Sequence, residues 1–402
     1  MDKMWEPPRL RTVGGAEEER RATWLELFFD LVFVAAIAEL SHSLSDNVSL
    51  GGFLGFVALF MPIWWCWVGS TFYSTRFDTD DIGHRLLTLV QIAIVVALAV
   101  NTHYGLSKTS VSFALSYVAF RIVLILQYLS AGHFIPIARP MTNRYALGFG
   151  LGASLWLVSV FVPPPWRFGL WVLGLVVDFS TPLVMSRLIT QIPPSASHIP
   201  ERLGLFIIIV LGESILAVVR GLPDLDWNAS SITVGLLGLA IAFSLWWLYF
   251  DTVDGSPLRG ASLGKPLLGL TWLYAHLPLA IGVAATGVGV EHLVKSLGKG
   301  LPDSDRWLLC GSVGLGLTAL AGIHWITCTL GARRRKVLAA YRLGSAAFVA
   351  LLAIGGGNLA PIPLIALVAG ACGIQVVLDL AGQRRGAEAI ADPDHLKGYS
   401  KD

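Results

Sequence analysis

The chain has 402 residues, of which 54% are hydrophobic and only 14% are charged, and its mean hydropathy is +0.66. No water-soluble core could bury this much apolar surface, so the composition indicates an integral membrane protein. The formal net charge is +2 and the basic residues lie in short loops, which argues against nucleic acid as a partner. Membrane lipids and a small-molecule or ion substrate are the expected partners, and composition leaves the oligomeric state open.

Hydrophobic stretches of about 18 to 28 residues predict an all-α polytopic membrane protein with about twelve transmembrane helices. In chain order the predicted spans are 24–45, 50–74, 83–101, 109–131, 145–162, 166–189, 202–221, 229–250, 266–293, 306–330, 336–355 and 360–381. The charged segment 1–22 lacks the apolar core of a cleavable signal, so we expect the first span to anchor the chain in the membrane. A polar tail, 383–402, follows the last span.

The linker 191–199 contains two adjacent prolines and separates six predicted spans from six. It divides the chain into a first bundle, 23–190, and a second bundle, 200–382. A shift of 182 positions places the tryptophan pair of the eighth span on that of the second. We therefore predict a six-plus-six internal duplication, with the halves related by a pseudo-twofold axis along the membrane normal.

Lys and Arg residues concentrate in alternate loops, as the positive-inside rule describes. Most of the 29 basic residues fall on the side of the membrane that also holds both chain ends. They include the run Arg333-Arg334-Arg335-Lys336. Both termini are therefore predicted to be cytoplasmic.

One carboxylate, Glu213, lies near the middle of a hydrophobic stretch, 200–220. Counted from the start of that stretch, it lies roughly 18 Å into a hydrocarbon layer about 30 Å thick. Arg121, Asp178 and His276 reach a similar depth in other spans, so we expect the four to converge on a site for a proton or a charged solute. The alternative is a static ion pair between Arg121 and Glu213 that locks helices together.

The first span contains three further acids. Thr23 and Glu26 have the spacing of a capping box, so Glu26 has a structural explanation. Asp30 lies one turn further along, beyond the reach of a cap, and is the better candidate for a functional residue. Glu39 lies close to the outer surface, where a solvated rim is its expected place.

Three short motifs stand out in the chain, LELFFDLVFV at 25–34, LGES at 211–214 and WWLYFD at 246–251. They resemble those of the bacterial low temperature requirement protein A family. The resemblance implies a multi-pass inner-membrane protein that the family name links to growth in the cold. It implies no particular biochemical activity.

A second layer of polar residues is predicted nearer the cytoplasmic surface, where snorkelling offers a purely structural alternative. Besides Asp30, it comprises His324, Arg342 and Asp379. Two Asp-Thr-x-Asp loops, which begin at Asp78 and Asp251, also lie on that side.

The paired acids of these two loops, which end at Asp81 and Asp254, allow two interpretations. They could hold Mg²⁺ and a diphosphate, or they could be helix caps. The sequence leaves the question of a metal open. The 4 cysteines form no CxxC pair and the 9 histidines show no spacing typical of haem ligands, so we expect no cofactor.

Five tryptophans lie toward the predicted cytoplasmic ends of their spans, where aromatic belts form. They are Trp64, Trp65, Trp67, Trp246 and Trp247. We expect them to belong to such a belt rather than to stack on a cofactor.

A secondary transporter, in a form coupled to protons, is the favoured function, because it accounts for the midplane charges and the duplication. One alternative is a membrane-embedded, metal-dependent enzyme that acts on a lipid-linked substrate through the two Asp-rich loops. A channel, a receptor or an assembly factor is the other alternative.

Overall fold

The computed structural model of the chain describes residues 6–10, 22–78, 81–221, 228–327 and 332–391. The elements of the first half are β1 (Arg9–Leu10), α1 (Trp24–Asp46), α2 (Leu50–Arg76), β2 (Phe77–Asp78), α3 (Ile82–Thr102), α4 (Ser110–Phe134), η1 (Pro136–Ala138), α5 (Arg139–Ser159), α6 (Trp166–Val184) and α7 (Ser186–Ile189). The elements of the second half are α8 (His198–Gly221), α9 (Ala229–Phe250), α10 (Ser256–Ser262), α11 (Pro266–Lys295), α12 (Asp303–Ile326), α13 (Ala332–Gly355), η2 (Gly356–Asn358) and α14 (Pro361–Ala391).

Twelve helices in the described part of the chain have 19 or more residues, and 11 of them are long and apolar enough to cross a membrane. The twelfth, α5, has 21 residues but carries Arg139 and Arg144 in its first two turns. It packs between α4 and α6 at the place of the fifth predicted span. The predicted all-α polytopic architecture is confirmed.

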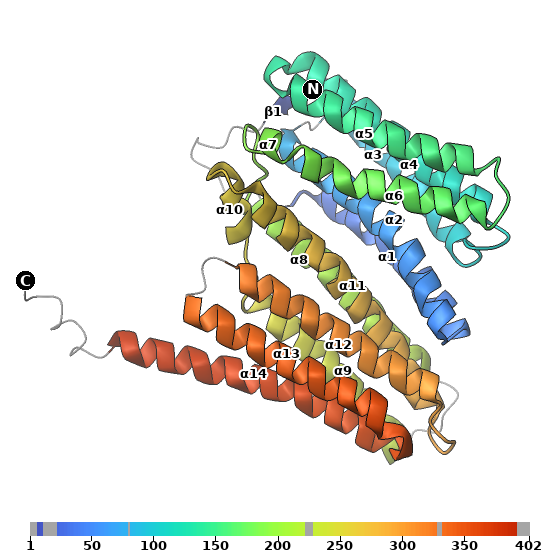
Figure 1. Ribbon diagram of the computed structural model, residues 1–402, viewed down its shortest axis with the longest axis vertical. Coiled ribbons are helices and arrows are strands. Elements are labelled where there is room, and N and C mark those ends of the chain that lie inside the picture. The colour runs from blue at the N-terminus through green and yellow to red at the C-terminus, as the bar shows by residue number, and fades with distance from the viewer. Residues whose placement is uncertain (1–5, 11–21, 79–80, 222–227, 328–331, 392–402) are drawn as a thin grey trace, which may run out of the picture.

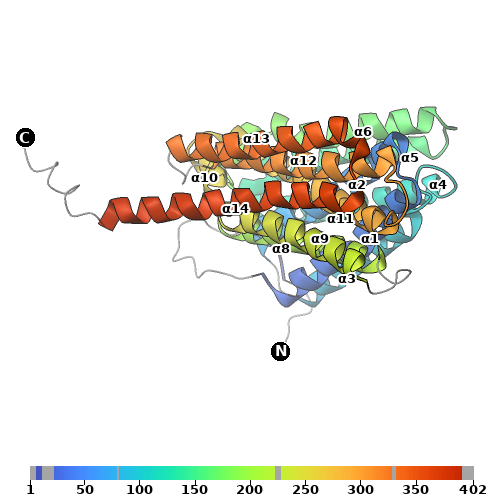
Figure 2. The ribbon, with the colours of Figure 1, turned by 90° about the horizontal axis from the view of Figure 1, so that it is seen from below.

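The sixth and the last predicted spans differ most from the observed helices at their C-terminal ends. The sixth is broken after Val184, because Pro182 has no N–H to donate and its ring clashes with the preceding turn. The last helix, α14, continues through the first part of the predicted polar tail to Ala391 and projects beyond its neighbours (Figure 2). Most of the predicted segment 1–22 and residues 392–402 lie outside the described part of the chain.

The two halves lie side by side, with α1 to α6 in one group and α8 to α14 in the other (Figure 1). Four helix contacts recur in both halves. In the first half α1 contacts α3, α3 contacts α4, α4 contacts α5 and α5 contacts α6. In the second half α8 contacts α11, α11 contacts α12, α12 contacts α13 and α13 contacts α14. A parallel repeat predicts this order, although the duplication itself stays a prediction.

Both described ends of the chain lie at one end of the bundle (Figure 1). There β1 pairs antiparallel with β2, which directly follows α2. Gln383, near the end of α14, donates a hydrogen bond to Asp251 at the end of α9. We call this end, which carries β1 and β2, the proximal end, and the opposite end, which carries the turns after Thr102 and Lys295, the distal end. An even number of membrane-crossing helices requires both chain ends to lie on the same side of the membrane.

The expected aromatic belt is wrong for the tryptophans of α2. Trp64, Trp65 and Trp67 are fully buried, and Trp65 stacks on Phe179 of α6 with ring centroids 4.3 Å apart. These indole rings point toward neighbouring helices rather than toward lipid, so they belong to the hydrophobic core between the helices. In the second half, Trp246 is exposed.

Candidate functional site

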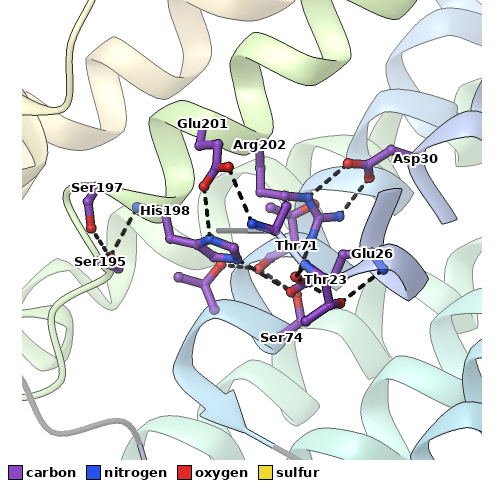
Figure 3. Close-up of polar contacts among 12 residues, drawn as sticks. Thr23, Glu26, Asp30, Thr71, Ser74, Ser195, Ser197, His198, Glu201 and Arg202 are labelled. Carbon is purple, nitrogen blue, oxygen red and sulfur yellow. Dashed lines mark hydrogen bonds and ion pairs between the residues drawn. The ribbon is translucent and has the colours of Figure 1, made fainter. Parts of the chain in front are cut away.

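A buried ion pair joins the first helix of each half. Nε of Arg202 on α8 donates to Oδ2 of Asp30 on α1 at 2.9 Å, and Nη2 donates to Oδ1 at 2.6 Å (Figure 3). Each of the two residues is only 1% exposed. The planar guanidinium fits the carboxylate with two parallel hydrogen bonds, which is the strongest geometry for such a pair.

The start of α1 brings a second carboxylate to the same arginine. Thr23 caps α1 and accepts a hydrogen bond from the backbone N–H of Glu26, while Oε2 of Glu26 accepts one from the backbone N–H of Thr23 at 2.8 Å. The predicted capping box is confirmed. The other carboxylate oxygen, Oε1 of Glu26, lies 3.2 Å from Nη1 of Arg202. Glu26 therefore caps the helix and pairs with Arg202 at once.

His198, the first residue of α8, extends this arrangement. Its Nε2 lies 3.4 Å from Oε1 of Glu26, and its Nδ1 lies 3.5 Å from Oε2 of Glu201 (Figure 3). Trp67 of α2 donates its indole N–H to Oδ1 of Asp30 at 2.7 Å. We call Glu26, Asp30, His198, Glu201 and Arg202 the Arg202 cluster. Within the cluster, Glu26, Asp30 and Arg202 together carry a formal charge of −1. One added proton would neutralise this charge.

A small polar cavity of about 20 Å³ adjoins Arg202 and Glu26. Its other lining residues are Leu25, Phe29, Ser70, Tyr73, Ser74, His84, Thr88, Gln91 and Gln127. This volume is large enough for a water molecule, and the hydroxyl and amide groups supply the partners that a buried water needs. The cavity can therefore bring a proton donor or acceptor to the cluster.

The alternative interpretation, a static ion pair between Arg121 and Glu213, is wrong. Nη2 of Arg121 on α4 lies 3.3 Å from Oδ2 of Asp178 on α6, and both side chains are fully buried. Between them, the hydroxyl of Tyr117 donates to Asp178 and accepts two N–H groups of Arg121. This triad lies within the first half.

Glu213 pairs instead with a residue of its own helix. Nη2 of Arg220 donates to Oε1 of Glu213 at 2.6 Å, and Nε of Arg220 lies 4.0 Å from Oε2 of Glu291. Because α8 begins at His198, Glu213 lies roughly 22 Å along the helix and nearer to the distal end than predicted. An arginine two turns later on the same side of a helix can reach back to it.

His276 has a third, separate environment. Its Nε2 lies 3.1 Å from the hydroxyl of Tyr249, and its Nδ1 lies 2.8 Å from the carbonyl oxygen of Trp272. The four residues predicted to converge are therefore distributed over three places. Only Arg121 and Asp178 are in contact among them.

The secondary candidates have partners in the second half. Arg342 on α13 pairs with Asp379 and Gln375 on α14, and His324 on α12 contacts the hydroxyl of Thr252. These contacts fix helices against one another. Glu39 is half-buried near the distal end of α1, in keeping with the predicted rim.

The Asp-rich loops act as caps in the described residues. Oδ1 of Asp81 accepts the N–H of His84 at the start of α3, and Oδ1 of Asp254 accepts the N–H of Ser256 at the start of α10. The described part of the chain does hold one group with metal-ligand chemistry, at the distal end. It consists of His42, Asp46 and His103, whose ligand atoms all lie within 4.8 Å of one another.

The sequence did not identify Arg202, His198 or Trp67 as site residues. Arg202 lies at the first turn of a hydrophobic stretch, where the positive-inside rule alone accounts for a basic residue. The one signal for these residues in the sequence is the adjacent pair Glu201-Arg202 at the start of this stretch. It did not indicate that the arginine points toward α1.

Comparison with known proteins places the chain among bacterial membrane proteins. The family model described as bacterial low temperature requirement A protein (LtrA) matches residues 21–377, which include helices of both halves. Among curated proteins, "Uncharacterized protein RA0937" of Rhizobium meliloti (strain 1021) is 30% identical over 287 residues, or 68% of this chain and 70% of that protein. No solved structure matches the chain.

Proposed function

We propose that this chain, which belongs to the bacterial low temperature requirement A (LtrA) family, is a proton-coupled secondary transporter of a small solute. One observation carries the proposal: polar contacts join α1 to the second half at both ends. At the proximal end these are the contacts of Asp30 with Arg202. At the distal end, the hydroxyl of Ser45 donates to Oε1 of Glu291 on α11 at 3.0 Å.

Alternating access moves one half of a transporter against the other around a central site. Contacts that cross the interface at one end must break when that end opens. The pairs Asp30–Arg202 and Ser45–Glu291 therefore work as proximal and distal closures, and α1 is the element that exchanges one for the other.

Protonation supplies the coupling. An ion pair broken in a buried place leaves an uncompensated charge, which costs about 3 to 5 kcal/mol. A proton on Glu26 or Asp30 removes part of that cost, so opening of the proximal end and uptake of a proton favour each other. The cavity beside Glu26 is large enough for a water molecule, which would deliver that proton to the cluster.

The solute would bind deeper in the bundle. Arg121 and Asp178 offer a charged pair there. His276, in its separate environment, is a second group that can exchange a proton. Glu213, with Arg220 and Glu291, belongs to the distal closure. The excess of basic residues at the proximal end supports an orientation in which that end, with both termini, faces the cytoplasm.

Proteoliposomes that contain a pH-sensitive dye test the proposal. Pools of amino acids, sugars, organic acids and metal salts are added outside, and the internal pH is recorded. We expect one pool to drive proton movement with the wild-type chain and not with Glu26→Gln. Glutamine retains the capping role at this position, so the loss would report the missing charge rather than a damaged helix.

Arg9→Gln is the matched control, since Arg9 is an exposed proximal residue outside the cluster. A rate of solute uptake that is the same with and without a pH gradient would contradict the coupling. Equal proton movement in the wild type and in Glu26→Gln would remove the Arg202 cluster from the mechanism.

A further inference from the structure

Arg76, the last residue of α2, is a buried cation without an ionic partner among the described residues. It is 3% exposed, and neither Nε nor Nη1 has a hydrogen-bond acceptor there. Other described arginines that are similarly buried, such as Arg121, Arg202 and Arg342, form an ion pair with a carboxylate. A buried charge without a counter-charge is costly, so the position calls for an anion.

Two aromatic rings flank the guanidinium of Arg76. Its Cζ lies 5.4 Å from the ring centroid of Phe72 and 6.0 Å from that of Tyr145. Cation–π contacts of this kind offset part of the charge through the flat faces of the guanidinium. Two nitrogens at its edge, Nε and Nη1, have no acceptor among the described residues.

Arg76 is one of the residues that line a cavity of about 30 Å³ between the two halves. The first half contributes Arg76, Phe72 and Tyr145 to its wall, and the second half contributes Leu258, Pro266 and Leu273. Arg76 is the charged residue of this wall, which is otherwise almost entirely apolar. The cavity belongs to neither the Arg202 cluster nor the Arg121 triad.

We propose that this cavity, which we call the Arg76 cavity, binds a carboxylate that carries an apolar group. A planar carboxylate matches the free edge of a guanidinium with two charge-assisted hydrogen bonds. The volume admits a few water-sized groups, which suits a carboxylate with one or two attached carbons. The apolar wall favours a hydrocarbon group over a second charge.

This chemistry has two sources, a free short-chain carboxylate or the head of a fatty acid from the membrane. The proposal does not depend on proton coupling.

A ligand in the Arg76 cavity touches both halves, so its binding energy would favour the state in which the proximal ends of the halves are close.

Binding of propionate to the purified full-length chain in detergent tests the proposal. Saturation-transfer NMR of the propionate methyl group gives the affinity, and propionamide is the neutral probe of the same shape. We expect propionate to bind and propionamide to bind much more weakly. Arg76→Gln should weaken propionate binding about ten- to hundredfold, because hydrogen bonds to a charged group are lost.

Arg187→Gln is the control, since it removes an exposed basic residue of α7 close to the cavity wall. It should leave propionate binding unchanged. Arg76→Lys keeps the positive charge but cannot donate two parallel hydrogen bonds to a carboxylate, so it should bind propionate with intermediate affinity. This variant also tests the proposal if Arg76→Gln does not fold. Without ligand, the thermal unfolding temperature of Arg76→Gln should not fall, because the change removes an unpaired charge.

Decanoate separates the two sources. Competition by decanoate at a concentration at least about tenfold below that of propionate would identify a fatty acid, and weaker competition would identify a free small carboxylate. Equal binding of propionate and propionamide would overturn the proposal. Equal losses in Arg76→Gln and Arg187→Gln would overturn it as well.

Discussion

Arg202 of α8 donates two hydrogen bonds to Asp30 of α1, so one buried ion pair connects the first helices of the two halves. Removal of either partner leaves the other charge buried and unpaired. We expect Arg202→Leu to lower the free energy of unfolding by about 3 to 5 kcal/mol. The double change Arg202→Leu with Asp30→Leu should recover much of this loss, as measured by unfolding in mixed micelles.

Arg9→Leu provides the control for this measurement. Arg9 lies 3.3 Å from Glu6 in an exposed pair, and such pairs contribute about 0 to 1 kcal/mol. A loss at Arg202 no larger than that at Arg9 would show that the buried pair does not hold the halves together.

A double-mutant cycle distinguishes the partner of Arg121. Arg121 and Asp178 share the hydroxyl of Tyr117, so Arg121→Leu and Asp178→Leu should show a coupling energy of about 0.5 to 3 kcal/mol. Arg121→Leu and Glu213→Leu should be additive within about 0.5 kcal/mol, because Glu213 pairs with Arg220. Strong coupling to Glu213 would instead support the alternative of a static ion pair between Arg121 and Glu213.

Much of the fold follows from the sequence, because a span is a local property of some twenty consecutive residues. Hydropathy predicts the helices and the linker, and three short motifs predict the family that the match over residues 21–377 confirms. Pairing between helices is not local. Depth along a helix placed Arg121, Asp178 and Glu213 at one level, but the rotation of each helix decides which of them meet, and depth carries no information on rotation.

The capping box shows the opposite case. Thr23 and Glu26 are three residues apart, so their contact is fixed by helix geometry and was predicted correctly. The second partner of Glu26, Arg202, comes from the other half of the chain. Only the packing of α1 against α8 reveals it.

Close packing of α8 against α11 depends on Gly287. A Cβ atom added at Gly287 would lie 2.5 Å from Cα of Ser214, next to Glu213. We expect Gly287→Ala to lower the free energy of unfolding by about 1 to 3 kcal/mol, because the two backbones must separate. Gly311→Ala on α12 meets no atom within 4 Å and should be neutral or stabilising by up to about 1 kcal/mol. Equal effects would show that the helices adjust freely.

Accessibility of single cysteines to a membrane-impermeant maleimide tests the orientation. Ser197 is exposed at the proximal end and Lys299 is exposed at the distal end. In a variant without other cysteines, Lys299→Cys should react in spheroplasts, because the basic proximal end is predicted to face the cytoplasm. Ser197→Cys should react only after lysis. Reaction of both before lysis, or the reverse order, would contradict the orientation.

Glu213 provides the test of the distal closure. Its Oε1 accepts a hydrogen bond from Arg220, which is 39% exposed, whereas Oε2 has no partner among the described residues. Glu213→Gln keeps an acceptor for Arg220 and removes the charge, so the unfolding free energy should change by less than about 1 kcal/mol. If the charge of Glu213 helps to close the distal end, proton movement in proteoliposomes should fall sharply in this variant. Glu39→Gln, at a half-buried position on α1, should retain it. Undiminished proton movement in Glu213→Gln would show that Glu213 only anchors Arg220 and takes no part in transport.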